Sequence, residues 1–206
     1  MSAVIDATPT AKLASNDHPI LDILRRRWSG RAVDPRPLPR ATLASLLEAA
    51  RWAPSAGNGQ PWAFLVFDGA DAAARADAEA CLNEGNAWAK RAPVLLLSVA
   101  RELRPDGKAA PTARHDLGLA TENLLIQAIA LGLLAHPMGG FDHAEATRRF
   151  ALPDSAVPMA MIAVGYPGDP FTLEEKHRAS YAEPRTRKAM TDIAFAGRWG
   201  TGWTAT

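Results

Sequence analysis

The residue types that bind phosphate are gathered near the start of this 206-residue chain. Three consecutive arginines end at Arg27, and Trp28, Ser29, a glycine and Arg31 follow them. Planar guanidinium groups hold phosphate oxygens through paired hydrogen bonds, and a serine hydroxyl adds a further donor. The stretch indicates an anion site, although a solvated helix end whose arginines compensate the helix dipole would have the same composition.

A second stretch, APSAGNGQPW at residues 53–62, combines a restricted backbone with short polar side chains. Two prolines, the first of them Pro54, and two glycines accompany Ser55, Asn58 and Gln60. Loops of this composition can hold polar groups in the direction of a ligand. An ordinary long surface loop is the alternative.

A third stretch, HPMGGFD at residues 136–142, places two glycines between a short expected strand and an expected helix. Asp142 with Glu145 predicts a capping box at the start of that helix. Glycines after Met138 permit either a close backbone approach to a flat ligand or a simple tight turn. We expect His136 to be structural, because a lone histidine is often partly buried and no metal set surrounds it.

Residues 53–62 resemble the core motif of the nitroreductase family, the FMN-dependent oxidoreductases whose signature reads P-S-x-x-N-x-Q-P-W. That motif is matched without a gap by Pro54, Ser55, Asn58, Gln60, Pro61 and Trp62. Three further family patterns have counterparts here: an N-terminal R-x-S-x-[RK] at residues 27–31, a G-F-D-like turn at 140–142, and a C-terminal K-x-R at 185–187. A solvated basic pair is an equal alternative for the last of these.

The resemblance implies an FMN site and a role for each matching residue. Arg27 and Ser29 would hold the 5′-phosphate, and Arg31 would lie by N1 and O2 of the flavin. The backbone N–H of Gly139 would point at N5, with Gly140 beside it. The complete cofactor-binding set implied is Arg27, Trp28, Ser29, Arg31, Pro54, Ser55, Asn58, Gln60, Met138, Gly139, Gly140, Arg185 and Arg187.

The resemblance also implies an α+β fold, with a mixed β-sheet flanked by helices in an intertwined homodimer. Two FMN sites would lie at the interface, and Ser55, Asn58 and Gln60 would reach across from the other subunit. Trp199 and Trp203 are large apolar side chains near the C-terminus, and we expect them to pack on the partner subunit.

The activity implied is hydride transfer from NAD(P)H through FMN to a small acceptor such as a nitroaromatic or a quinone, by a ping-pong mechanism. FMN carries the chemistry, so no catalytic side chain and no metal are required. A flavin-binding or flavin-storage protein, or a flavin-modifying branch of the same fold, would share every FMN contact. A phosphate-binding module unrelated to flavin would leave residues 55–62 unexplained. The sequence does not choose between NADH and NADPH, because it has no glycine-rich dinucleotide fingerprint.

Apolar patterns predict the elements that would position these residues. Strands are expected over 62–68, 93–100 and 157–164, and helices over 19–27, 41–52, 69–83 and 114–134, the last of them buried. A polar loop is expected over 101–113. His115 and Asp116 have the residue types of a catalytic pair, but neighbours on a helix do not face one another. Asn86 and Trp88 are candidates for lining a substrate channel, with core packing as the alternative for the tryptophan.

Composition limits the remaining classes of function. With 48% hydrophobic residues the chain can build one core, so we expect a flexible leader at 1–17 and a single domain at 18–206 whose tail lies at the dimer interface. A net charge of +1 gives no general attraction to nucleic acid or membrane. The only cysteine, Cys81, excludes an internal disulfide and fits a cytoplasmic setting.

Overall fold

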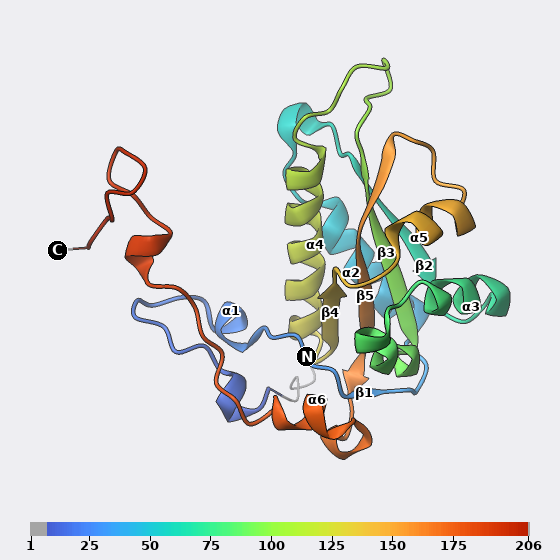
Figure 1. The fold of residues 1–206 in the computed structure, drawn as a ribbon, viewed down its shortest axis with the longest axis horizontal. Helices are drawn as coiled ribbons and strands as arrows, with labels where there is room; N and C mark the ends of the chain where they lie inside the picture. The colour runs from blue at the N-terminus through green and yellow to red at the C-terminus, as the bar shows by residue number, and fades with distance from the viewer. Residues whose placement is uncertain (1–7, 206) are drawn as a thin grey trace.

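A computed structural model describes residues 8–205, in which a β-sheet carries helices on both faces (Figure 1). The central strand is β5 (Ala156–Pro167). It pairs with β3 (Val94–Arg101) on one edge and with β4 (Leu134–Met138) on the other. The expected α+β class with helices flanking a sheet is confirmed.

Every strand pairing in the described residues is antiparallel, whereas the resemblance implied a mixed sheet. β2 (Trp62–Phe67) pairs with β3, and β1 (Val33–Asp34) pairs with the last two residues of β5. β3 and β4 run in the same direction, but β5 lies between them and opposes both. β3 and β4 are therefore parallel to each other, but no hydrogen bonds join them directly.

The alternation of side chains along β3 divides the core into two clusters. Leu95, Leu97 and Val99 point to one face of the sheet, and Leu96 and Ala100 point to the other. Both faces of this strand are buried, which explains its unbroken apolar sequence.

One face of the sheet is covered by α2 (Arg40–Arg51) and α4 (Ala113–Ala130). We expected α4 to continue to residue 134, but it ends at Ala130. Gly132 has a φ of 70°, and the N–H of Leu133 donates to the carbonyl of Ala128, which closes the helix and releases the chain into β4.

α4 is buried on one side only, which corrects the prediction of a fully buried helix. Its buried residues recur at helical spacing and include Asp116, Leu117, Leu124 and Leu125. On the opposite side Gly118 and Glu122 are exposed, and Leu119 and Ile126 are half-buried. A long helix with an uncovered, partly apolar side is a candidate for contact with another molecule.

The second face is covered by three shorter helical segments: α3 (Ala72–Ala80), the 3-10 segment η3 (Glu84–Arg91) and α5 (His143–Arg149). Asp71 caps α3 by accepting hydrogen bonds from two backbone N–H groups of its first turn. The predicted helix at 69–83 is therefore present but shorter than expected, and η3 was not predicted.

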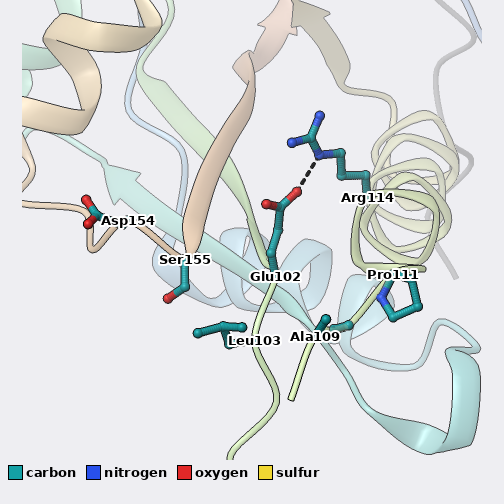
Figure 2. Close-up of a pocket in the computed structure, with 8 residues that line it drawn as sticks. Glu102, Leu103, Ala109, Pro111, Arg114, Asp154 and Ser155 are labelled. Carbon is teal, nitrogen blue, oxygen red and sulfur yellow. Dashed lines mark hydrogen bonds and ion pairs between the residues drawn. The ribbon is translucent and has the colours of Figure 1, made fainter. Parts of the chain in front are cut away.

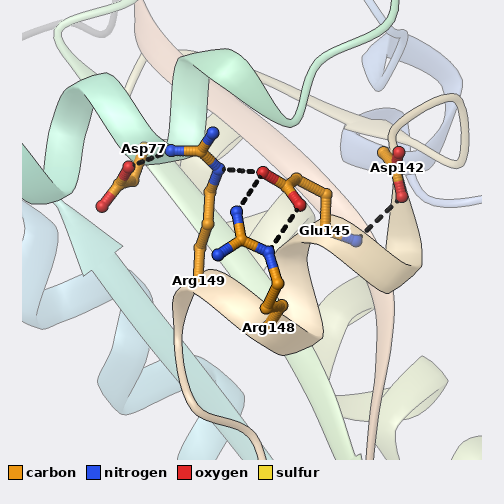
Figure 3. A network of polar contacts seen from close by, with 5 residues as sticks. All are labelled: Asp77, Asp142, Glu145, Arg148 and Arg149. Atoms are coloured by element: carbon orange, nitrogen blue, oxygen red, sulfur yellow. Dashed lines mark hydrogen bonds and ion pairs between the residues drawn. The ribbon is translucent and has the colours of Figure 1, made fainter.

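The cap of α5 is only half of the predicted capping box. Asp142 Oδ1 accepts from the N–H of Glu145 at 2.8 Å, but the Glu145 carboxylate binds Arg148 and Arg149 instead of returning to the cap (Figure 3). Arg149 also contacts Asp77, which joins α5 to α3. The two arginines are stronger partners for the carboxylate than a single backbone N–H is.

The N- and C-terminal segments lie together beside the lower half of α4 in Figure 1. The N-terminal segment holds a 3-10 turn, Thr10–Lys12, and α1, Asp22–Arg26. α1 begins after Leu21 without a side-chain cap, and it is shorter than the helix expected over 19–27.

Part of the expected flexible leader, residues 1–7, lies outside the described residues. In the remainder Lys12 is buried, and its ammonium group donates to the carbonyl of Glu183. The flexibility of this segment stays a prediction.

The C-terminal segment contains η4 (Pro170–Thr172), α6 (Glu175–Ala179) and η5 (Met190–Asp192), and then leads away from the sheet (Figure 1). Trp199 is 91% exposed. Among the helices of residues 8–205, none is long and apolar enough to cross a bilayer.

Candidate functional site

The arginine segment, which we define as residues 25–31, is joined to the C-terminal segment by Arg185. Its two terminal nitrogens donate to the backbone carbonyls of Arg27 and Arg25, the latter at 2.7 Å. Arg27 in turn donates to the hydroxyl of Ser29 at 3.4 Å. Two predicted FMN contacts, Arg27 and Ser29, therefore lie together with a third, Arg185, which is 158 positions from Arg27 in the sequence.

Cations outnumber anions around this segment. A cavity of about 390 Å³ lies here, and we call it the phosphate cavity. The charged residues that line it are four cations, Arg27, Arg185, Arg187 and Lys188, and two carboxylates, Asp17 and Glu122. Glu122 Oε1 lies 4.0 Å from Arg27 Nε. Burial, with the charges of Arg27 and Arg187, lowers the pKa of Arg185.

Two guanidinium nitrogens are buried without a partner among the described residues: Nε of Arg185, which lines the phosphate cavity, and Nε of Arg31 in the arginine segment, which does not line it. A buried, unpaired donor on a cationic group is costly, so native proteins normally satisfy it. An anion bound beside these arginines would supply the missing acceptors. The residues present thus fit a phosphate group.

A buried histidine ties the arginine segment to the sheet. His136 Nδ1 lies 3.2 Å from the carbonyl of Gly30, and its ring packs on Trp88 with centroids 4.8 Å apart. Burial lowers the pKa of His136 to about 4, so the ring is neutral near pH 7. A Cβ on Gly30 would lie 2.9 Å from Leu134 Cδ1, which explains the glycine. His136 is structural, as the sequence predicted.

Trp28 and Met138 are core residues. Trp28 packs edge-on against Tyr181 with centroids 4.9 Å apart, and both Trp28 and Met138 are buried in the cluster on the arginine side of the sheet. The two side chains are thus mostly enclosed by protein, and the indole Nε1 of Trp28 is buried without a partner in residues 8–205. Tyr181, which the sequence did not single out, accepts hydrogen bonds from the N–H groups of Arg31 and Ala32.

The motif loop, residues 53–62, is held by its own polar side chains. Ser55 Oγ accepts from the N–H of Gln60 at 3.1 Å, and Gln60 Nε2 donates to Asn58 Oδ1 at 3.1 Å. Asn58 and Gln60 have φ angles of 57° and 47°. Left-handed backbone at a residue other than glycine costs about 1–2 kcal/mol and often marks a functional position.

One buried carboxylate anchors this loop to α4. Asp116 Oδ2 accepts from the N–H of Ala56 at 3.2 Å and from Thr112 Oγ1 at 3.0 Å. His115 Nδ1 lies 3.2 Å from Oδ1, so the expectation that the two side chains would not face one another is wrong. Burial alone would raise the pKa of Asp116, but hydrogen bonds from His115, Ala56 and Thr112 hold it below its usual value.

The glycine turn after β4 is shaped by two asparagines. The carbonyl of Gly140 accepts from Asn86 Nδ2 at 2.8 Å, and a Cβ on Gly140 would lie 2.6 Å from Asn83 Nδ2. Gly139 is exposed, and a Cβ there would have no atom within 4 Å. Gly140 is required by packing, whereas Gly139 borders open space. Trp88, the other candidate for a channel, is buried.

The structure gathers the predicted residues into two groups rather than one. The motif loop lies at the N-terminal end of α4, whereas α1 and the arginine segment lie beside its C-terminal half (Figure 1). Their contacts on α4, Asp116 and Glu122, are six residues apart, or about 9 Å along the helix axis. Asp116 binds the motif loop and Asn86 binds the glycine turn, and each is far in the sequence from the residue that it binds. Residue patterns alone therefore did not identify these two contacts. Within residues 8–205 no cluster of three metal-binding side chains is present.

Comparison with known proteins shows the family of this chain. The sequence pattern of the Nitroreductase family matches residues 24–166. A crystal structure described as an oxidoreductase containing FMN is 34% identical, with a TM-score of 0.84 over 90% of this chain and 96% of that one.

Two curated proteins are also similar. An NADH dehydrogenase from Thermus thermophilus is 31% identical over 73% of this chain and 89% of its own length. An uncharacterized 15.4 kDa protein from Mycolicibacterium smegmatis is 41% identical over 58% of this chain and 80% of its own length. With the matched segment running from α1 through β5, the chain belongs to the nitroreductase family.

Proposed function

We propose that this protein is an FMN-dependent NAD(P)H oxidoreductase of the cytoplasm that reduces a small acceptor such as a nitroaromatic or a quinone. The observation that carries the proposal is the phosphate cavity, where Arg27, Arg185 and Arg187 gather and the buried Nε of Arg185 has no acceptor in the described residues. The similar FMN-containing oxidoreductase supports FMN as the anion, and the Thermus NADH dehydrogenase supports a nicotinamide donor.

In this proposal Arg27, Ser29 and Arg185, with Arg187 at the rim, hold the phosphate of FMN. Arg31 lies toward N1 and O2 and stabilises negative charge there. The N–H of Gly139 is directed to N5, and the open space beside Gly139 allows a flat ring to approach. Bound FMN would supply the hydride chemistry, accepting hydride at N5 and returning it to the acceptor.

The site is completed by a second copy of the chain. The motif loop is anchored at the N-terminal end of α4, whereas Glu122 of the phosphate cavity lies near the middle of that helix. In the proposed homodimer Ser55, Asn58 and Gln60 serve the partner's FMN. The uncovered side of α4 and the exposed Trp199 supply apolar surface for such an interface. In this proposal residues 18–206 of each subunit form one domain, and its C-terminal tail lies at the dimer interface.

Purified protein tests the cofactor. It should be yellow, release FMN rather than FAD on heating, and lose its flavin absorption when NADH or NADPH is added without oxygen. A colourless protein that takes up no added FMN would refute the proposal. Tight FMN binding without reduction by either nicotinamide would instead favour a storage or flavin-modifying role.

Steady-state kinetics test the order of substrates. If donor and acceptor use the same face of the ring in turn, double-reciprocal plots should show parallel lines, and the acceptor should restore the flavin absorption that the donor removed. Intersecting lines would show that both substrates bind together and would contradict the ping-pong mechanism.

A further inference from the structure

A hairpin that connects β3 to α4 lies beside the motif loop. The sequence predicted only a polar loop here, but Leu103 and Ala109 form an antiparallel bridge, and the N–H of Gly107 donates to the carbonyl of Arg104 at 2.9 Å. Gly107 has a φ of 80°, which suits the turn residue of a short hairpin. The hairpin therefore holds its side chains on a defined backbone.

Between this hairpin and the motif loop lies a cavity of about 330 Å³, which we call the hairpin cavity. Gly59 and Gln60 of the motif loop line one side, and Arg101 and Arg104 line the other. The N–H of Arg101 donates to the carbonyl of Pro61 at 2.7 Å, so the two sides are joined by a backbone hydrogen bond.

The charges in the hairpin cavity are unbalanced. Neither Arg101 nor Arg104 has an ion-pair or side-chain hydrogen-bond partner in residues 8–205. The one carboxylate that lines the cavity, Asp116, already accepts hydrogen bonds from Ala56 and Thr112 and contacts His115. Two arginines without ion-pair partners thus line a cavity whose only carboxylate is already hydrogen-bonded, and this excess of positive charge attracts an anion.

A neighbouring cavity, which shares Leu103, Ala110 and Ser155 with the hairpin cavity, has the reverse balance of charge. Its volume is about 510 Å³, and its charged lining residues are Glu102, Asp154 and Arg114 (Figure 2). Glu102 and Arg114 form an ion pair at 2.6 Å, so the net negative charge of this cavity comes from Asp154. An anion is therefore favoured in the hairpin cavity and disfavoured in the neighbouring one.

We infer that the hairpin cavity binds phosphate groups of the nicotinamide donor, an inference that rests on the proposed function. Its volume is at the lower end for small-molecule sites, so it suits the phosphate-bearing part of a dinucleotide rather than the whole. The motif loop that forms its other wall is the element proposed to reach the partner's FMN. A donor held by Arg101 and Arg104 would therefore have its phosphates at the edge of the ring site.

Binding of non-reacting probes to the FMN-loaded protein tests this inference. ADP carries the 5′-diphosphate common to both nicotinamides, and adenosine 2′,5′-bisphosphate carries the 2′-phosphate found only in NADPH. Calorimetric titration should show dissociation constants about tenfold higher in Arg101→Ala and Arg104→Ala than in the wild type. Arg114→Ala is the matched control, because this arginine belongs to the neighbouring cavity and is already paired.

The two probes distinguish the source of the phosphate. Weaker binding of both probes assigns the arginines to the 5′-diphosphate, and weaker binding of the bisphosphate alone assigns them to the 2′-phosphate. In either case KM for the corresponding donor should rise while kcat changes little. Unchanged affinity for both probes in both variants would overturn the inference while leaving reduction by nicotinamide intact. A wild-type protein that binds the probes but is reduced by neither nicotinamide would refute the proposed function instead.

Discussion

The arginine segment and the motif loop carry equally clear sequence motifs, but the structure supports them in different ways. The arginine segment is packed between β4 and the C-terminal segment and is fixed by His136 and Arg185. The motif loop is exposed, is closed by its own side chains, and is anchored to the helix beneath it by Asp116. The arginine segment is fixed by contacts with distant parts of the chain, and the motif loop presents polar groups outward.

This difference accounts for the unsatisfied groups in each region. The arginine segment and Arg185, which binds it, have buried donors that need an acceptor, namely the Nε atoms of Arg31 and Arg185. The motif loop instead has strained backbone at Asn58 and Gln60 and exposed side chains. A ligand between two copies of the chain would satisfy the first region and use the second.

The largest expected effect follows from removing a phosphate contact in the arginine segment. Arg27→Ala should raise the dissociation constant for FMN about ten- to a hundredfold, since a hydrogen bond to a charged group contributes roughly 1.5–3 kcal/mol. Fluorescence titration measures it. Arg25→Ala is the matched control, because that side chain pairs with Asp22. Equal FMN affinity in wild type and Arg27→Ala would remove Arg27 from the site.

A second prediction concerns pH and applies to the arginine segment alone. The pKa of His136 is about 4 in the folded chain and near 6.5 when unfolded, so the unfolded state binds the extra proton between these values. Stability therefore falls as pH drops below about 6.5, by about 2 kcal/mol between pH 7 and pH 5. His136→Gln keeps a donor for Gly30 but does not titrate, so this part of the pH dependence should disappear. Denaturant midpoints at the two pH values that change equally in both proteins would contradict the prediction.

A smaller effect is expected at the anchor of the motif loop. Asp116→Ala removes the acceptor of the Ala56 N–H and the Thr112 hydroxyl, and should cost about 1 kcal/mol of unfolding free energy. Amide hydrogen exchange at residues 56–60 should become faster, while exchange at residues 27–32 should not change. Asp116→Asn retains one carbonyl acceptor and should have an intermediate effect. Unchanged exchange in the loop of Asp116→Ala would show that the loop does not depend on this carboxylate.

The parts of the fold that were predicted are those set by local apolar patterns. The strands expected at 62–68, 93–100 and 157–164 correspond to β2, β3 and β5, and the helix at 41–52 corresponds to α2. The end of α4 was misplaced because apolar residues continue past Gly132, whose backbone conformation no periodicity reveals. The hairpin at 102–110 was missed because its turn residues were interpreted only as polar.

The same distinction applies to the candidate site. Motif residues could be named from the sequence, but Asp116 and Ala56 are 60 positions apart and Asn86 and Gly140 are 54 apart, so their contacts depend on the fold. The His115–Asp116 contact was missed because the rule about neighbouring positions describes helix interiors, whereas this pair lies in the first turn with an exposed imidazole. The assignment of individual residues to FMN remains a prediction.

The central claim is that each FMN site takes its arginine segment from one chain and its motif loop from the other. Two variants that bind FMN poorly as homodimers, Arg27→Ala and the double variant Asn58→Ala/Gln60→Ala, can be unfolded together and refolded as a mixture. If the claim is correct, half of the dimers are mixed and half of their sites have two wild-type halves, so about one quarter of wild-type FMN binding should return. Differently tagged chains that co-purify as mixed dimers, yet recover no FMN binding, would contradict it.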